Sequence, residues 1–270
     1  MKISVVIPTY NRYEVLKRAL ASVFAQTYQP SEVIVIDDGS SDETSKIIQD
    51  FPSIIYRYQN NAGVSSARNL GISLCSYEWI AFLDSDDAWH EEKLALHVSL
   101  HKADKELFFS YTDEQWIRDG KEMKVPKKFQ KFSGDIFSQC LSHCIIAPSS
   151  AFIHKKLFED IGVFDESLEV CEDYDLWLRL TWKHKVGLIE QAMTIKYGGH
   201  TDQLSMKYWG MDRFRVVALE KLLSSHIKED EVKEILVQKY NILLQGVRKY
   251  QKIKDAKLYE ERLKSLATEY

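Results

Sequence analysis

Two acidic clusters carry the residue types that could do chemistry, and each follows an apolar stretch rich in β-branched residues. Asp37 and Asp38 follow the apolar residues of EVIVIDDGS, and Asp84 and Asp86 follow those of WIAFLDSDDAWH. Two carboxylates separated by one residue can direct oxygen ligands to one point, and Mg²⁺ and Mn²⁺ favour such ligands together with phosphate oxygens. The alternative is that these acids only end strands and cap the helices that follow. A single cluster favours the capping role, whereas two clusters at one edge of a sheet favour a binding site.

The first hundred residues alternate strand and helix patterns, which predicts an α/β fold. Strands are expected in ISVVIP, EVIVID, IIYRYQN and WIAFLDSD, and helices at about 15–24, 42–50, 65–75 and 91–103. Ser40 and Glu43 have the spacing of a capping box for the second helix. This alternation predicts right-handed crossovers and a mostly parallel sheet with helices on both faces. Ligands of such sheets bind beyond the carboxyl ends of the strands, where both acidic clusters should therefore meet.

The second half of the chain has a different organisation. A strand and hairpin are expected to turn at Asp119 and Gly120, followed by a lysine-rich mobile loop at 121–131. A strand at 149–153, a helix at EDYDLWLRLTW and two short strands at 186–189 and 193–197 come next. Beyond residue 208 the pattern is helical throughout. We therefore predict one unit at 1–207 and a C-terminal helical appendage at 208–270.

Composition and charge restrict the classes of function. Of the 270 residues, 45% are apolar, which is enough for a hydrophobic core, and the formal net charge is −4. This mild negative charge argues against a general nucleic-acid-binding protein. The chain begins with a strand-like run rather than a signal peptide and has no apolar run of 18 or more residues. A cytoplasmic location is expected.

The four cysteines do not form a disulfide or zinc-binding pattern. Cys75, Cys140, Cys144 and Cys171 lack a C-x-x-C spacing, so we expect reduced, mostly buried thiols. Cys140 and Cys144 flank His143 one helical turn apart, which would suit a metal site, but no second pair of ligands accompanies them. Three side chains of an ordinary helix are the favoured interpretation.

Five segments of the chain resemble, in order and spacing, the family 2 glycosyltransferases, a large inverting group with the GT-A fold. They are VVIPTYNR, VIVIDDGSSDET, NNAGVSSARNLGI, WIAFLDSDDAW and CEDYDLWLRL, and the resemblance covers about residues 1–200. It implies a GT-A domain that binds a nucleoside-diphosphate sugar, most often linked to UDP. It also implies transfer of the sugar to an acceptor hydroxyl with the help of Mn²⁺ or Mg²⁺.

The resemblance also implies roles for residues of the first four segments. Asp38 would bind the uracil or ribose of the nucleotide, together with Thr9 and Asn11 on the neighbouring loop. Arg68 would contact the nucleotide or its diphosphate, and Asp84 would lie near the ribose. Asp86 would bind the metal ion. From the residue types alone, Arg68 could equally be a surface helix residue, and Thr9 and Asn11 could be turn formers.

Three further residues receive roles from the later part of the resemblance. Asp173 would be the general base for the acceptor hydroxyl, and Glu172 would orient the base or the acceptor. Both could instead be acids that complement the dipole of a helix, as could Asp175. His200, in YGGHTDQLS, would approach the metal or the diphosphate, with a solvated loop histidine as the alternative.

The expected partners are the sugar donor and a glycan, surface polysaccharide or lipid-linked acceptor. The C-terminal helices could contact the inner face of a membrane or a second copy of the chain, with an ordinary solvated helix face as the favoured alternative. The segment 121–131 could be a lid or acceptor clamp, with a solvated surface loop as the favoured alternative. One rival is an aspartyl phosphotransferase, but its D-x-D motif normally ends the first strand and is followed by a threonine. A glycoside hydrolase with two carboxylates would not explain DDGS or Arg68. A sugar-nucleotide-binding protein without turnover is the non-enzymatic alternative.

Overall fold

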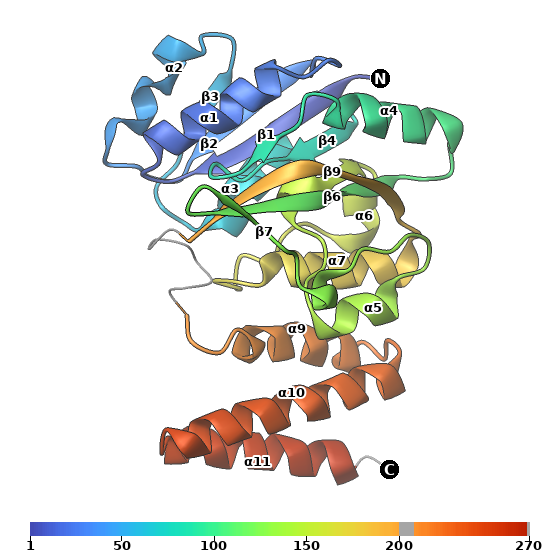
Figure 1. Ribbon diagram of the computed structural model, residues 1–270. Coiled ribbons are helices and arrows are strands. Elements are labelled where there is room, and N and C mark those ends of the chain that lie inside the picture. Colours follow the sequence, from blue (N-terminus) through green and yellow to red (C-terminus); the bar gives the residue numbers. More distant parts are fainter. Residues whose placement is uncertain (200–207, 269–270) are drawn as a thin grey trace.

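A computed structural model describes residues 1–199 and 208–268, in which the strands form one twisted sheet (Figure 1). The strand order is β3-β2-β1-β4-β8-β6-β9-β5, with β7 beside β6. The first four of these pair in parallel, whereas β8 runs antiparallel to both β4 and β6. The strands are β1 (Ile3–Thr9), β2 (Glu32–Asp37), β3 (Ile55–Tyr58), β4 (Trp79–Phe82), β5 (Ala88–Trp89), β6 (Phe109–Arg118), β7 (Lys121–Met123), β8 (Ala151–His154) and β9 (Gly187–Gly198). The predicted α/β fold is confirmed.

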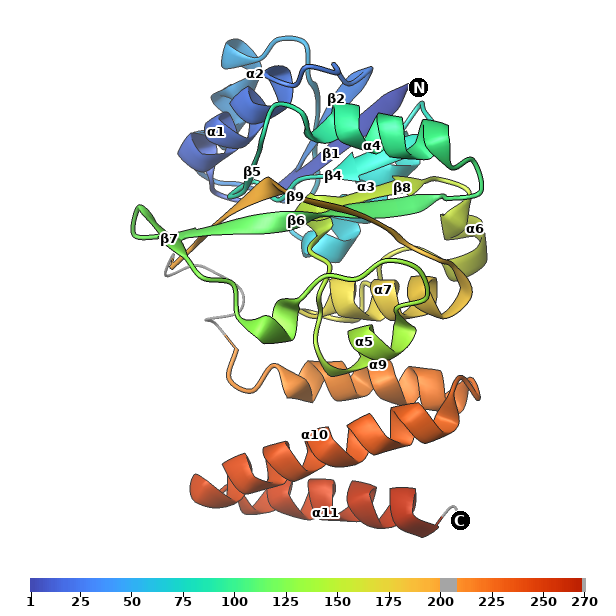
Figure 2. The ribbon, with the colours of Figure 1, turned by 45° about the vertical axis from the view of Figure 1, so that its right-hand side comes forward.

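Helices cover both faces of this sheet, and further helices form layers below it (Figures 1 and 2). One face is covered by α1 (Tyr13–Phe24), α2 (Ile47–Asp50) and α4 (Lys93–Ala103), and the other by α3 (Val64–Leu74), α6 (Leu157–Ile161) and α7 (Glu172–Lys183). Beyond α7 lie α5 (Phe137–Ser142), α9 (Asp212–Ser224), α10 (Glu229–Lys249) and α11 (Ile253–Thr268). Short 3-10 helices span Glu43–Lys46, Lys127–Phe129 and Pro148–Ser150.

The apolar strand β1 lies at the centre of the first half and is buried on both faces. Val5 and Ile7 contribute to the core on the α1 side, and Val6 contributes to the core on the α3 side. A run without polar alternation therefore suits this strand. Gly71 allows α3 to pack closely, because a Cβ there would lie 2.3 Å from Val6 Cγ1. This close packing brings the first turns of α3, which carry Arg68, against the sheet.

The C-terminal helices share the core on the α7 side of the sheet. Leu219 of α9 and Leu236 of α10 are fully buried, in the same hydrophobic cluster as Trp177 of α7. The boundary between 207 and 208 remains a prediction. No helix within the described ranges is both long enough and apolar enough to cross a membrane.

The predicted capping box between Ser40 and Glu43 is wrong, because Asp42 caps the helix instead. Asp42 caps the 3-10 helix that starts at Glu43, since its Oδ1 accepts a hydrogen bond from Thr44 N at 2.9 Å. Ser40 Oγ instead accepts from Asn11 N at 2.7 Å, across to the loop after β1. A spacing rule considers only partners that are close in sequence. Here the Ser40 hydroxyl instead binds the backbone of the loop after β1, which is distant in sequence.

Three expectations for the second half also need correction. The two short strands at 186–189 and 193–197 are one strand, β9, whose pairing with β6 is interrupted by bulges. The segment 121–131 begins as β7 and ends at Lys131, which is buried and paired with Glu114 at 2.7 Å, so its end is an ordered part of the core. Helix α5 ends at Ser142, so His143 and Cys144 do not belong to it. The four thiols are free, and only Cys144 among them is partly exposed.

Two histidines of α4 lie buried beside Ser110 of β6. His97 Nδ1 and His101 Nε2 each lie 2.7 Å from Ser110 Oγ. Burial lowers the pKa of His101 to about 4, from an ordinary value of 6.5. Between about pH 4 and pH 6.5, His101 therefore binds a proton in the unfolded chain but not in the folded protein. The stability that neutral His101 provides is complete above pH 6.5 and is lost as the pH falls toward 4.

We expect acidification from pH 7 to pH 5 to lower the melting temperature, and to lower it less in the variant His101→Phe. The phenyl ring keeps the packing of the imidazole but takes up no proton. Thermal melts at both pH values measure the difference. His226→Phe, at an exposed site, is the matched control. Equal losses in His101→Phe and the parent protein would contradict the assignment.

Candidate active site

The carboxyl ends of β1 and β2 meet, as the sequence predicts, and Asp38 organises the loop beside them. Asp38 N donates to Thr9 O at 2.9 Å. The buried Asp38 carboxylate accepts hydrogen bonds from Gln59 Nε2 at 2.7 Å, Ala62 N at 2.8 Å and Gly63 N at 2.9 Å. Asp38 thus fixes the loop that leads into α3. Its contact with a nucleotide remains a prediction.

Asn11 connects the same two loops. Its backbone is in the left-handed region, with φ of 51°. Its Oδ1 accepts from Ser41 N at 2.8 Å and from Asp42 N at 3.3 Å. Asn11 therefore holds the loop after β2 in place, a turn-forming role that is compatible with nucleotide binding by neighbouring groups.

Arg68 joins two other residues to which the resemblance gives roles, Asp84 and Glu172. Its Nη2 donates to Asp84 Oδ1 at 2.7 Å, and its Nη1 donates to Glu172 Oε1 at 2.6 Å. The guanidinium is 4% exposed, so this bridge is a buried charge network rather than a surface contact. The surface-helix alternative for Arg68 is excluded.

The two carboxylates of this network respond differently to Arg68. Burial alone would raise the pKa of Asp84, but the charge of Arg68 outweighs it and holds this pKa below its usual range. For Glu172 burial prevails and raises the pKa to about 7, against the opposite effect of Arg68. The difference follows the neighbouring charges, because Lys196 and Arg12 lower the pKa of Asp84 further, whereas the Asp173 carboxylate raises that of Glu172.

Replacing Arg68 by methionine should destabilise the protein by about 3–5 kcal/mol, the usual cost of removing one partner from a buried ion pair. Asp84 and Glu172 would then lose the cation that both contact. Urea unfolding of the ligand-free protein measures the change. Arg57→Met, at an exposed position of β3, should change stability by less than about 0.5 kcal/mol. A loss in Arg68→Met no larger than that of the control would contradict the network.

We call the acids that follow β2 and β4, Asp38, Asp84 and Asp86, the acidic rim. Asp86 of this rim is partly exposed and already binds a cationic group. Arg12 Nη1 lies 2.7 Å from Asp86 Oδ2, and the side chain of Asp86 is 18% exposed. Arg18 Nη2 donates to the Asp86 carbonyl oxygen at 2.5 Å, which fixes the backbone. Nearby in the chain, Asp87 is turned inward and accepts from Ser149 Oγ at 2.6 Å. Of this adjacent pair, Asp86 is the one available to a ligand.

The residues at this rim fit a divalent cation bound together with a diphosphate. Asp86 offers a hard carboxylate that already accepts positive charge, and such sites need only one or two protein carboxylates. The buried hydroxyl of Thr9, at the end of β1, has no hydrogen-bond partner within the described residues, so this edge has a polar atom to offer a ligand. No group of three or more metal-ligating side chains occurs within 1–199 and 208–268. His200 lies outside the described residues.

Lys196 is a site residue that the sequence analysis missed. It lies on β9 opposite Trp116 of β6. Burial alone would lower the pKa of its ammonium group, but the carboxylates of Glu114, Asp87 and Asp84 raise it instead. The ammonium group of Lys196 therefore lies among carboxylates at the acidic rim. The available signal was a lysine in the otherwise uncharged run of strand AMTIKYGG.

Asp173 is the second residue of α7, after Glu172, and a strained turn precedes the helix. The preceding residue, Cys171, has a left-handed backbone with φ of 64°, which is uncommon for a residue other than glycine. Asp173 Oδ1 accepts from Tyr174 N at 2.7 Å. Burial, and then the adjacent Asp173 carboxylate, raise the pKa of the Cys144 thiol. The candidate base Asp173 is therefore partly exposed, and the thiols of Cys144 and Cys171 both lie close to it.

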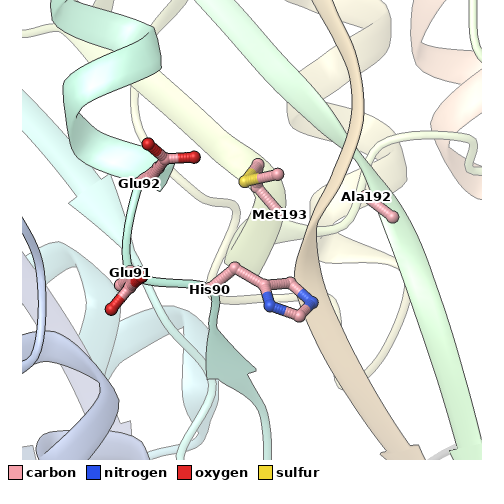
Figure 3. Close-up of a pocket in the computed structure, with 5 residues that line it drawn as sticks. All are labelled: His90, Glu91, Glu92, Ala192 and Met193. Carbon is pink, nitrogen blue, oxygen red and sulfur yellow. The ribbon is translucent and has the colours of Figure 1, made fainter.

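A separate hollow of about 260 Å³ lies at the junction of the segment after β5 with β9 (Figure 3). It is lined by His90, Glu91, Glu92, Ala192 and Met193. None of these residues belongs to the acidic rim. The hollow is therefore distinct from the candidate site.

Comparisons with known proteins identify the family of the chain. The family model described as Glycosyl transferase family 2 matches residues 4–162. A glycosyltransferase of Rickettsia felis is 34% identical over 207 residues, which are 74% of this chain and 34% of that protein. The chain thus spans about a third of the length of that relative.

Two further similarities concern a named enzyme and a solved structure. The Escherichia coli enzyme WfaP, a UDP-Glc:alpha-D-GlcNAc-diphosphoundecaprenol beta-1,3-glucosyltransferase, is 31% identical over 67% of this chain and 70% of its own length. The crystal structure of Staphylococcus aureus TarS 1–349 in complex with UDP-GlcNAc superposes with a TM-score of 0.70 at 21% identity, over 89% of this chain and 72% of that one. The predicted GT-A fold is confirmed by this match. By the family model and by its relatives, the chain belongs to glycosyl transferase family 2.

Proposed function

We propose that the protein is an inverting glycosyltransferase that moves a sugar from a nucleoside diphosphate, most simply UDP, to an acceptor hydroxyl. The observation that carries the proposal is the Arg68 bridge, which joins Asp84 at the strand rim to Glu172 beside Asp173. The bridge thereby supports a site in which Asp84, on the proposed donor side, lies close to Glu172, the residue that precedes the proposed base. WfaP, which uses UDP-Glc and a lipid-linked acceptor by its name, supports the donor class.

The mechanism follows from the charges. Breaking the bond between the anomeric carbon and the diphosphate leaves negative charge on the diphosphate oxygen. Arg68 and Lys196 supply positive charge beside the rim, and preorganised charge of this kind is usually the largest single contribution to catalysis. A bound Mg²⁺ or Mn²⁺, held by Asp86, would add a further positive charge at the diphosphate.

The acceptor side needs a proton acceptor on the opposite face of the sugar. We assign this role to the Asp173 carboxylate, which takes the proton of the attacking hydroxyl. Glu172 orients Asp173 or the acceptor. Because the hydroxyl displaces the diphosphate in one step, the configuration at the anomeric carbon inverts and no enzyme nucleophile is needed. Thr9, Asn11 and Asp38 frame the nucleotide.

Differential thermal melting with and without Mn²⁺ tests the donor assignment. UDP and UDP-sugars should raise the melting temperature more when Mn²⁺ is present, since a ligand stabilises the folded state in proportion to its occupancy. Release of UDP from a UDP-sugar should then distinguish an enzyme from a binding protein, which would be stabilised but release nothing. Absence of any stabilisation across uridine, guanosine, thymidine and cytidine nucleotides would refute the proposal.

The acceptor and the setting of the reaction belong to the same proposal. We propose a glycan, surface polysaccharide or lipid-linked acceptor, used by an enzyme at the cytoplasmic side of the cell envelope. We also propose that the C-terminal helices contact a membrane or a second copy of the chain. The aspartyl phosphotransferase alternative gains no support from the acids at this rim, since no threonine follows the D-x-D of the fourth strand.

A further inference from the structure

A second charged cluster lies beyond Asp173, where the C-terminal helices reach the catalytic part. Asp212 and Arg215 come from α9, Lys239 from α10, and His143 from the segment after α5. Arg215 Nη1 and Lys239 Nζ both lie 2.9 Å from the same oxygen, Asp212 Oδ1. Lys239 Nζ also donates to Ser142 O at 2.8 Å, beside His143. Figures 1 and 2 both place α5, α7 and α9 next to one another.

The cluster has more positive than negative charge. Asp212 is one carboxylate shared by two cations that are 18% and 6% exposed. The buried Nε of Arg215 has no hydrogen-bond partner in the described part of the chain. Burial lowers the pKa of His143, and the charges of Lys239 and Arg215 lower it further. A buried cation without full compensation is costly, so this arrangement suits an added anion.

Contacts through two thiols connect the cluster to the base. Cys171, which precedes Glu172 and Asp173, has its thiol 3.9 Å from Met211 O, and Arg215 N bonds to that same carbonyl at 3.3 Å. Cys144, which follows His143, adjoins Asp173. The cations of α9 and α10 therefore lie close to Asp173, and none of these contacts involves the Arg68 network.

We infer that Arg215, Lys239 and His143 form a subsite for the phosphate group of an anionic acceptor, so the acceptor is a phosphate- or diphosphate-bearing molecule. The guanidinium of Arg215 supplies a directional donor through its unpartnered Nε, and Lys239 supplies charge. The inference rests on the proposed function, because it places the acceptor beside Asp173. It also gives the C-terminal helices a part in substrate recognition.

The subsite is tested with inorganic phosphate as the probe and with UDP and Mg²⁺ saturating the donor site. Binding is followed on the whole chain by the ³¹P linewidth of the phosphate signal. We expect saturable binding, weakened at least about tenfold in Arg215→Met, since a hydrogen bond to a charged group contributes roughly that factor or more. Arg215→Lys, which retains the charge, should bind more tightly than Arg215→Met.

The matched control is Arg213→Met, on the same helix. Arg213 lies over the rings of Trp209 and Phe214 rather than in the cluster, so its loss should leave phosphate binding unchanged. Arg215→Met should fold, because Asp212 keeps Lys239 as a partner, and its melting temperature verifies this. Geranyl phosphate and glycerol 3-phosphate are then added as competitors, and the stronger one distinguishes a lipid phosphate from a polyol phosphate.

Two outcomes overturn the inference. They are the absence of saturable phosphate binding in the presence of UDP, and equal binding by Arg215→Met and the parent protein. If UDP with Mg²⁺ still stabilises the protein in either case, only the acceptor subsite fails and the proposed function stands. If UDP gives no stabilisation, the proposed function itself fails.

Discussion

Replacing Asp173 by asparagine is expected to lower the turnover of sugar transfer by roughly 10²- to 10⁴-fold, the usual contribution of a positioned general base. The amide keeps the size of the carboxylate and can still accept from Tyr174 N, so the start of α7 should be retained. It cannot take the proton of the acceptor hydroxyl. Initial rates of UDP release at saturating donor and acceptor measure the loss, and UDP affinity should be unchanged.

Glu169→Gln is the matched control for this variant. Glu169 is an exposed acid shortly before α7. Its loss should leave turnover within about twofold of the parent enzyme, because most exposed substitutions have small effects. Parent-like turnover in Asp173→Asn would show that the base is another residue, whereas loss of UDP binding would show that Asp173 acts at the donor.

Replacing Asp86 by alanine should remove the metal-dependent part of donor binding and lower kcat by about 10²- to 10³-fold, which corresponds to roughly 3–4 kcal/mol for one preorganised contact. The variant loses the carboxylate that accepts Arg12 at 2.7 Å and that would hold the cation. Thermal melts with UDP, with and without Mn²⁺, provide a measurement independent of turnover. In the variant the two curves should coincide.

Asp104→Ala provides the control, since Asp104 is an exposed acid after α4. Its UDP stabilisation should depend on Mn²⁺ as in the parent protein. The metal assignment is wrong if sugar transfer continues at the parent rate in excess EDTA. It is also wrong if Mn²⁺ still strengthens UDP binding in Asp86→Ala.

Sequence alone determined the parallel half of the sheet and the place of the acidic rim. The runs that form β1, β2 and β4 are continuous and apolar, so their ends can be located without knowledge of their partners. Asp38 follows the end of β2 directly, and Asp86 lies four residues beyond the end of β4. The order of strands and helices then required that these ends share one edge. The five segments that resemble the family added the expected roles of these residues. They could do so because each segment is a short local motif and their order along the chain is recognisable.

Only the tertiary structure decided which charged residues that are distant in sequence contact one another. Arg68 meets Glu172 across 104 positions of sequence, and Lys196 joins the rim only because β9 pairs with β6 beside Trp116. Arg215 and Lys239 meet on one oxygen of Asp212 through the packing of two helices. Periodicity and spacing report the surroundings of a residue along the chain. The partner of a buried charge is set by chain segments that pack together from afar, so local patterns do not contain it.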